Sequence, residues 1–383
     1  MKIESYCIYS FPVRAKTDWL ILELISQDKT AGYSEITMSN YEERTTLISY
    51  IKKCMSTLSG SELKNDLQVK MILEKGKENT LANNTSISGV RSACSDIFSK
   101  LQKLPMNIYL NKKMDIKNSD SIELYANINR SLLPNDEGPV DRSPNSFLMM
   151  AKKAKKAGFK NLKCAPFDGF DKEAYENKEF INLGLEKVSL ISKELKNEMK
   201  ILVDCHSKFN FQESKFVEKK LNELGVEWFE EPMNPLSNLE ELRALKKEIN
   251  SNLVGGEEFY GVNNFNNLIK NNFLDIVMPD IKYCGGIEEA LSIGLSLENI
   301  SKNSFSIHCP SGPISLAGSA HVTSALNSML PLEHAVFEIE DRYDYTHPNE
   351  RIIGGKYILS SDFGIGVKPN FSKRNTRLLE EII

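Results

Sequence analysis

The chain has 383 residues, of which 41% are hydrophobic, so it is long enough to bury a large core and to form two domains. Its formal net charge of −4 gives no basic excess for nucleic acid, and no apolar run approaches the roughly 20 residues of a membrane span. Seven cysteines without a CxxC pair indicate neither a disulfide framework nor a zinc site. Because the chain start also lacks the apolar core of a signal peptide, we expect a cytoplasmic protein.

The first part of the chain reads as strands followed by helices. Residues 3–9 alternate between polar and apolar, and Trp19 begins a second apolar strand. The short polar loop between these strands carries two cations, Arg14 and Lys16. From about residue 41 to 110 the apolar spacing turns helical. This order predicts an α+β domain over residues 1–118.

From residue 119 onward, predicted strands alternate with predicted helices. The predicted strands are Ile122–Ile128, Asn161–Pro166, Ile201–His206, Glu227–Glu230, Leu253–Glu257, Ile276–Asp280, Phe305–His308 and Ala335–Ile339. Eight strands in about 220 residues is the size of one α/β barrel, a TIM barrel, over residues 119–345. A doubly wound sheet is the alternative, but it would not bring seven strand ends to one point. The glycine-rich segment 346–383 is expected to return to the first domain.

Three of the predicted strands end in carboxylates. Asp204 closes one strand, Glu230 the next and Glu257 the one after, at separations of 26 and 27 residues, which is about one strand–helix unit each. In a parallel barrel all three side chains would meet at the C-terminal mouth, where barrel enzymes hold their active sites. Three hard oxygen ligands suit a Mg²⁺ that keeps positions open for water and substrate.

Other strand ends also carry ionisable groups. These groups are Lys163, His206, Asp280, His308 and Glu338. Any one of them could be a buried polar side chain with a purely structural role. Because buried charges are costly unless they are paired or bound to a metal, a structural explanation must account for all of them together. The full set favours a metal-assisted acid–base site.

The motifs at these positions resemble one family. They are Trp228-Phe-Glu-Glu-Pro, Gly255-Gly-Glu, Met278-Pro-Asp, Gly285-Gly and His308-Cys-Pro-Ser-Gly-Pro. Together with Asp204 they resemble the mandelate racemase branch of the enolase superfamily, over nearly the whole chain. The resemblance implies a modified TIM barrel, (β/α)7β, whose N-terminal α+β capping domain is completed by the C-terminal segment. It implies Mg²⁺ held by Asp204, Glu230 and Glu257, and removal of a proton α to a carboxylate to give an enediolate.

The resemblance also implies roles and partners for the protein. The substrate would be a small-molecule carboxylate, and neither nucleic acid nor membrane would be a partner. The protein would be a homo-oligomer built from dimers, with an octamer as one form. Asp280 would orient His308, the base, and Glu338 would donate to the substrate carboxylate.

Two positions separate the chain from the racemases of this branch. Ala165 stands where racemases keep a second lysine base, so Lys163 is expected to stabilise the substrate carboxylate instead. His206, two residues past Asp204, matches acid-sugar dehydratases such as galactonate dehydratases, where it protonates the departing hydroxyl. Asp168 could contact substrate or serve as a turn residue, and Arg14 or Lys16 could hold substrate or form a surface salt bridge.

The leading prediction is therefore a Mg²⁺-dependent dehydratase of a sugar acid or another β-hydroxy carboxylate, with a 2-keto acid as product. A racemase or epimerase that pairs His308 with Lys163 or His206 is the first alternative. A non-catalytic ligand-binding barrel is the alternative from another class, and the complete carboxylate triad with both histidines argues against it. Lys282 is offset by one position from the family's cation on the sixth strand, and we assign it no chemistry from the sequence.

Overall fold

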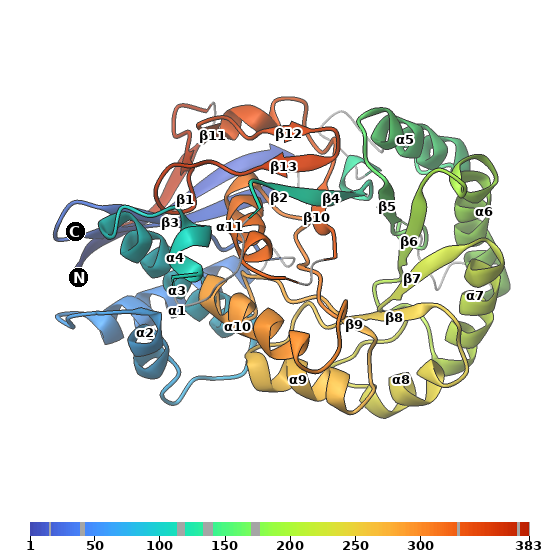
Figure 1. The fold of residues 1–383 in the computed structure, drawn as a ribbon, viewed down its shortest axis with the longest axis horizontal. Coiled ribbons are helices and arrows are strands. Elements are labelled where there is room, and N and C mark those ends of the chain that lie inside the picture. Colours follow the sequence, from blue (N-terminus) through green and yellow to red (C-terminus); the bar gives the residue numbers. More distant parts are fainter. Residues whose placement is uncertain are drawn as a thin grey trace.

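The computed structural model shows a barrel of parallel strands with a smaller domain packed beside it (Figure 1). It describes residues 1–14, 17–38, 43–112, 119–132, 141–169, 177–327, 330–373 and 376–382. The barrel strands run from β4 to β10, and the helices that follow them lie on the outside.

The smaller domain, the cap, is an antiparallel sheet covered by helices. Its sheet has the order β15-β1-β2-β3, with β1 Ile3–Arg14, β2 Thr17–Ser26, β3 Ala31–Glu35 and β15 Arg377–Ile382. Its helices are α1 Arg44–Leu58, α2 Asp66–Leu73, α3 Leu81–Leu101 and α4 Met106–Leu110. The alternating apolar residues of β1 and β2 face the helices and bury a core of their own that includes Ile8, Leu22 and Ile51.

The barrel strands are short and are bonded in chain order. They are β4 Ser121–Asn127, β5 Asn161–Cys164, β6 Lys200–Asp204, β7 Val226–Glu230, β8 Asn252–Gly255, β9 Ile276–Val277 and β10 Leu332–Ala335. Each pairs in parallel with the next from β4 to β9, and β10 pairs in parallel with β4. The helices are α5 Pro144–Lys156, α6 Asn177–Leu195, α7 Phe211–Glu223, α8 Leu239–Lys246, α9 Val262–Lys270, α10 Ile287–Glu298 and α11 Pro313–Ser324. A 3₁₀ turn, Arg130–Leu132, follows β4.

Two predicted strands differ from the structure. Residues 305–308 form no regular strand, although they run alongside β9: Phe305 bridges to Val277, and the His308 amide donates to the Pro279 carbonyl at 3.1 Å. The last barrel strand was predicted at Ala335–Ile339 but is β10, Leu332–Ala335. The chain leaves the extended conformation at Phe337, whose φ is +59°.

The segment after residue 345 lies on both domains. β15 pairs antiparallel with β1 of the cap, whereas β13 Lys356–Ile358 pairs with the first half of β4. β12 Ile352–Ile353 extends β13, and β11 Thr346–His347 pairs with β14 Lys368–Pro369. A 3₁₀ turn, Arg342–Tyr345, precedes β11. The segment thus adds one strand to the sheet of the cap and two to the sheet of the barrel.

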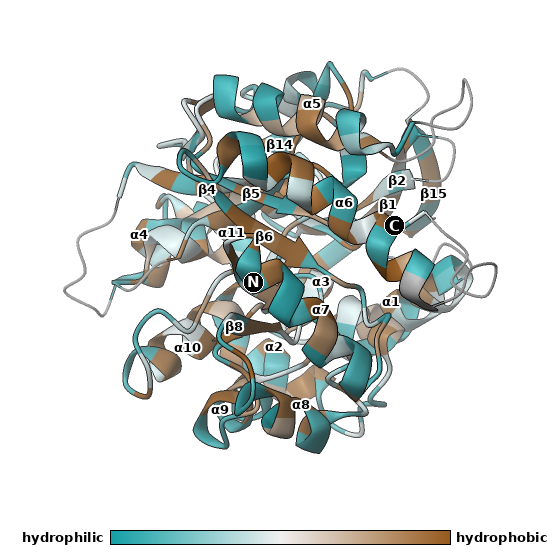
Figure 2. Cartoon of the chain, turned by 90° about the vertical axis from the view of Figure 1, so that its right-hand side faces the viewer, coloured by the Kyte–Doolittle hydropathy of each residue, from teal (hydrophilic) through white to brown (hydrophobic). Residues whose placement is uncertain are grey.

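The hydropathy of the elements follows their place in the barrel. The strands are largely hydrophobic and the outer faces of the helices are hydrophilic (Figure 2). This pattern is typical of parallel strands that are buried on both faces. In the part of the chain that the structure describes, no helix is long and apolar enough to cross a membrane.

Candidate active site

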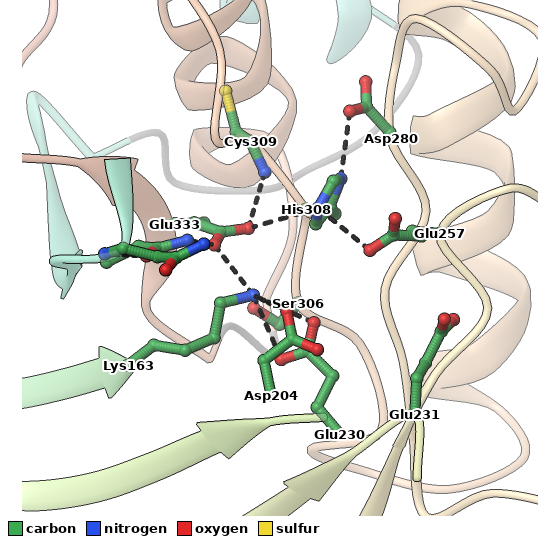
Figure 3. A network of polar contacts seen from close by, with 12 residues as sticks. Lys163, Asp204, Glu230, Glu231, Glu257, Asp280, Ser306, His308, Cys309 and Glu333 are labelled. Carbon is green, nitrogen blue, oxygen red and sulfur yellow. Dashed lines mark hydrogen bonds and ion pairs between the residues drawn. The ribbon is translucent and has the colours of Figure 1, made fainter. Parts of the chain in front are cut away.

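Three carboxylates stand at the carboxyl ends of neighbouring strands. Asp204 ends β6 and Glu230 ends β7, and the two residues are paired directly across the parallel ladder. Glu257 follows β8 by two residues. The strand pairing therefore sets Asp204 and Glu230 side by side, with Glu257 on the next strand end, as the sequence spacing predicts (Figure 3).

Each of these carboxylates contacts a cationic or protonatable side chain. The two Glu230 oxygens accept hydrogen bonds from Lys163 Nζ at 2.9 and 3.0 Å. Asp204 Oδ2 lies 3.0 Å from His206 Nε2, and Glu257 Oε2 lies 3.0 Å from His308 Nε2. Within the described residues, no group of three or more such ligands already surrounds one point. Three carboxylates on adjacent strand ends nevertheless form a donor set that fits a hard divalent cation such as Mg²⁺.

A glycine and a glutamate position the third carboxylate. Glu231, whose φ is +37°, accepts a hydrogen bond from the Gly256 amide at 2.8 Å. Gly255 has a φ of +156°, and a Cβ at this position would lie 2.7 Å from Glu231 Cγ. Glu231 thus supports the backbone that leads to Glu257, and Gly255 provides the space it needs.

His308 and Asp280 form a buried dyad. His308 Nδ1 lies 3.0 Å from Asp280 Oδ2, and the Lys282 amide donates to Asp280 Oδ1 at 2.8 Å. Burial lowers the pKa of His308, but the carboxylates of Glu257, Glu333 and Asp280 outweigh it and raise that pKa well above its ordinary value. The pairing fixes the orientation of the ring and leaves Nε2 directed at Glu257.

His206 belongs to a second histidine–aspartate pair. Its Nδ1 lies 2.8 Å from Asp168 Oδ2, and its φ of +44° turns the chain sharply after β6. The His206 side chain is 40% exposed; its partial desolvation opposes protonation, but Asp204 and Asp168 raise its pKa well above the ordinary value. Asp168, which the sequence offered as a substrate contact or a turn residue, here contacts His206. Asn129 Nδ2 donates to Asp168 Oδ2 at 3.2 Å, which further fixes this pair.

Glu333 is a site residue that the sequence reasoning missed. It lies on β10, and its Oε1 accepts hydrogen bonds from Lys163 Nζ and Asn127 Nδ2, both at 2.8 Å. Its Oε2 accepts from the Cys309 amide at 2.9 Å and lies 3.9 Å from His308 Nε2 (Figure 3). The available signal was a glutamate at the centre of the short run Leu332–Ala335, where a barrel strand would otherwise be apolar.

Glu338 and Arg14 lie beside each other next to the site. Arg14 donates from Nε to the Glu338 carbonyl at 2.8 Å, so this contact is to backbone and is not a surface salt bridge. The Glu338 carboxylate is buried, and neither oxygen has a hydrogen-bond partner within the described residues. Arg130 Nη1 lies 3.9 Å from Glu338 Oε1. Lys16, the other predicted contact in this loop, lies outside the described residues.

A cavity of about 220 Å³ lies between the cap and the ends of the barrel strands. Asp204, His206, Glu257 and His308 line it from the barrel. Its further walls are formed by Trp19, Glu35, Thr37 and Met38 of the cap and by Asn127, Asn129, Arg130, Lys282, Tyr283, Pro310 and Ser311 of the barrel. The cavity is thus a polar chamber with both histidines and two of the three candidate metal ligands on its wall.

The structure thus combines a capped barrel with carboxylates and histidines at the ends of its strands. Residues 148–373 match the family described as "Enolase C-terminal domain-like", and the chain therefore belongs to that family. The family and the fold expected from the sequence are confirmed.

Curated relatives are named as acid-sugar dehydratases. One is the D-gluconate/D-galactonate dehydratase of Picrophilus torridus, 27% identical over 63% of this chain and 59% of that protein. Another is the arabinonate dehydratase of Saccharolobus solfataricus, 31% identical over 38% of each chain. The D-xylonate dehydratase of Haloferax volcanii is 21% identical over 77% of this chain and 70% of its own length. This chain thus covers less than two thirds of the length of each of the first two relatives.

Solved structures share the whole fold at lower identity. A member of the enolase superfamily from Salmonella typhimurium has a TM-score of 0.86 at 21% identity and covers 99% of this chain and 100% of that one. A mandelate racemase/muconate lactonizing enzyme from a Sulfitobacter species has a TM-score of 0.83 at 17% identity and covers 97% of this chain and 93% of that one. These likenesses establish the fold of the cap and barrel together.

Proposed function

We propose that this protein is a Mg²⁺-dependent dehydratase that converts a sugar acid into a 2-keto acid. The observation that carries the proposal is that two imidazoles line one cavity and each is paired with an aspartate: His308 with Asp280, and His206 with Asp168. Dehydration needs a base for the Cα proton and an acid for the departing hydroxyl. The dehydratase names of the relatives support the same reaction.

The base is assigned to His308. Asp280 accepts the Nδ1 proton, which leaves the Nε2 lone pair free to take the Cα proton of the substrate. Asp204, Glu230 and Glu257 would hold Mg²⁺, whose charge would stabilise the anion that forms when this proton leaves. The same charge would offset that of Glu257, which in its absence favours the protonated imidazole.

The acid is assigned to His206. Asp168 and Asp204 contact its two ring nitrogens, an arrangement that favours the protonated ring. The C–O bond to the β-hydroxyl breaks as His206 transfers its proton, and the hydroxyl leaves as water. The enol that remains gains a proton at the former hydroxyl-bearing carbon and becomes the 2-keto acid. Overall, one molecule of sugar acid gives one keto acid and one water molecule, so the atoms balance.

Lys163 fits a stabilising role better than that of a second base. Its ammonium group donates to Glu230 and Glu333 and lies 3.8 Å from Asp204. Burial lowers its pKa, but these carboxylates outweigh burial and raise the pKa well above the ordinary value. Lys163 is bonded to these carboxylates and is not among the residues that line the cavity with His308, which argues against a racemase that pairs the two.

Product analysis tests the proposal. Purified protein with Mg²⁺ is incubated with D-gluconate, D-galactonate, D-arabinonate and D-xylonate, and the products are followed by NMR. We expect a 2-keto-3-deoxy acid from at least one of them. An epimer of unchanged composition would show the alternative reaction, and no change in any acid would contradict the proposal. The Glu257→Gln variant is the matched inactive control.

A further inference from the structure

We propose that Arg142 is a positioning residue that holds Asp168 against His206, the proposed acid. This inference rests on the proposed function, and it concerns the loss of water rather than the removal of the Cα proton. Arg142 is not among the described residues that line the cavity. Its side chain therefore acts on the site only through the groups to which it is bonded.

The start of α5 fixes the place of Arg142. The next residue, Ser143, caps this helix, and its hydroxyl accepts a hydrogen bond from the Ser146 amide at 3.3 Å. The guanidinium carbon of Arg142 lies 5.2 Å from the centre of the Phe147 ring. Gly169, with a φ of +83°, leaves room for the side chain, since a Cβ there would lie 2.7 Å from Arg142 Cδ. The side chain thus runs from the helix start to the loop after β5.

Arg142 holds the backbone of this loop. Its Nη2 donates to the Ala165 carbonyl at 2.9 Å, and its Nε donates to the Asp168 carbonyl at 3.2 Å. Between them, Lys187 of α6 donates to the Pro166 carbonyl at 2.8 Å. The planar guanidinium therefore bonds the residue at each end of the turn that carries the Asp168 carboxylate.

The same guanidinium sets the orientation of Asn129, which lies after β4 and lines the cavity. Nη2 donates to Asn129 Oδ1 at 3.1 Å, and Nη1 donates to the Leu132 carbonyl at 3.2 Å. Because a guanidinium has donors only, the Asn129 oxygen faces Arg142 and its amide nitrogen is left to donate to Asp168 Oδ2, at 3.2 Å. This oxygen is the one that lies 2.8 Å from His206 Nδ1. Arg142, Asn129, Asp168 and His206 thus form a relay of hydrogen bonds.

The relay determines which group the Asp168 carboxylate faces. Its other oxygen, Oδ1, lies 3.3 Å from Lys208 Nζ. A lysine ammonium is a point charge on a flexible stem and does not fix the plane of a carboxylate, whereas Arg142 and the amide that it orients do so. Without the relay, we expect Asp168 to turn toward Lys208 and His206 to lose its fixed direction. Removal of the Cα proton by His308, which Asp280 orients, does not depend on this loop.

The ratio of Cα exchange to dehydration tests the inference. Each variant is incubated with Mg²⁺ and the best acid sugar in deuterated water, and NMR follows deuterium at Cα and the keto acid. Arg142→Met removes every donor and keeps an apolar stem beside Phe147. We expect dehydration to slow 10- to 100-fold while exchange falls less than twofold, so the ratio rises at least fivefold. Arg351→Met, at an exposed arginine before β12, is the control and should match the wild type.

Other outcomes distinguish the possible errors. Equal losses of exchange and dehydration in Arg142→Met would show that Arg142 only supports the fold and would overturn the inference, as would unchanged dehydration. If Arg142→Met does not fold, Asn129→Asp takes its place: it keeps the acceptor for Arg142 but sets a second carboxylate against Asp168. The same rise in the ratio is expected, and an unchanged ratio would overturn the inference.

The His206→Asn variant separates this inference from the proposed function. A ratio that rises in His206→Asn but not in Arg142→Met would leave His206 as the acid and remove the role of Arg142. A ratio that rises in neither variant would remove the assigned acid and this inference with it. A wild type that converts no acid sugar would refute the proposed function itself.

Discussion

Asp168 Oδ2 lies 2.8 Å from His206 Nδ1, and this contact joins the loop after β5 to the loop after β6. It mirrors the bond of 3.0 Å between Asp280 and His308 on the other side of the carboxylates. The cavity therefore holds two imidazoles, each oriented by its own carboxylate. This arrangement is the basis for proposing that one imidazole acts as the base and the other as the acid.

Replacing Asp168 with asparagine should impair the acid without destroying the site. The amide keeps the shape of the side chain but loses the charge that favours a protonated His206. We expect kcat for dehydration to fall 10- to 100-fold, the range usual for residues that support a catalytic group. Steady-state kinetics on the best acid sugar measures this. Asp141→Asn, at an exposed aspartate before α5, should leave kcat unchanged; equal losses in both variants would contradict the assigned role.

Metal binding should depend on Glu257 and not on the glutamate beside it. Glu257→Gln removes one of three anionic ligands, and we expect Mg²⁺ affinity to fall at least 10-fold with loss of turnover. Titration calorimetry with MgCl₂ measures the affinity directly. The neighbouring Glu258→Gln variant is the matched control and should bind Mg²⁺ nearly as well as the wild type. Unchanged affinity in Glu257→Gln would remove Glu257 from the ligand set.

Gly255→Ala should destabilise the fold through a steric clash. The added Cβ would lie 2.7 Å from Glu231 Cγ, in a backbone conformation that side chains rarely adopt. We expect the free energy of unfolding to fall by about 2–4 kcal/mol, the sum of overpacking and backbone strain. Gly225→Ala, at a φ of +80° with open space around it, isolates the backbone part and should cost about 1 kcal/mol. Denaturant unfolding compares the two, and equal losses would show that the contact with Glu231 is unimportant.

His321 should make the protein sensitive to acid. It lies on α11, where Nδ1 accepts from the Asn107 amide and Nε2 donates to the Ile365 carbonyl, both at 3.2 Å. Burial lowers its pKa to about 4, below the ordinary value of 6.5. Between these pH values the unfolded chain binds a proton that the folded protein excludes, so stability falls as pH falls, by up to about 1.4 kcal/mol per pH unit.

The His321→Gln variant isolates this contribution. Denaturant unfolding at pH 7, 6, 5 and 4 should show a shallower loss of stability in the variant than in the wild type. His347→Gln, at an exposed histidine, is the control and should follow the wild type. Parallel curves for His321→Gln and the wild type would contradict a neutral buried imidazole.

The spacing of the strand-end residues predicted the barrel because each strand–helix unit has a nearly fixed length. The same regularity predicted the positions of Asp204, Glu230 and His308. It failed at the last strand, where the apolar run after Ala335 suggested a strand and Glu333 inside the true strand was overlooked. An inward-facing charge is stable there because Lys163, Asn127 and the Cys309 amide approach it from other parts of the chain. Such contacts, like those of Asp168 and Lys282, depend on the three-dimensional arrangement of the loops. A local sequence pattern does not predict them.

The assignment of His206 as acid and His308 as base is tested most directly by following the Cα proton and the water separately. The best acid sugar is incubated with Mg²⁺ in deuterated water, and NMR monitors deuterium at Cα together with the keto acid. His308→Asn should abolish both exchange and dehydration. His206→Asn should stop water loss while exchange at Cα continues. Dehydration by His206→Asn at a rate close to that of the wild type would contradict the account.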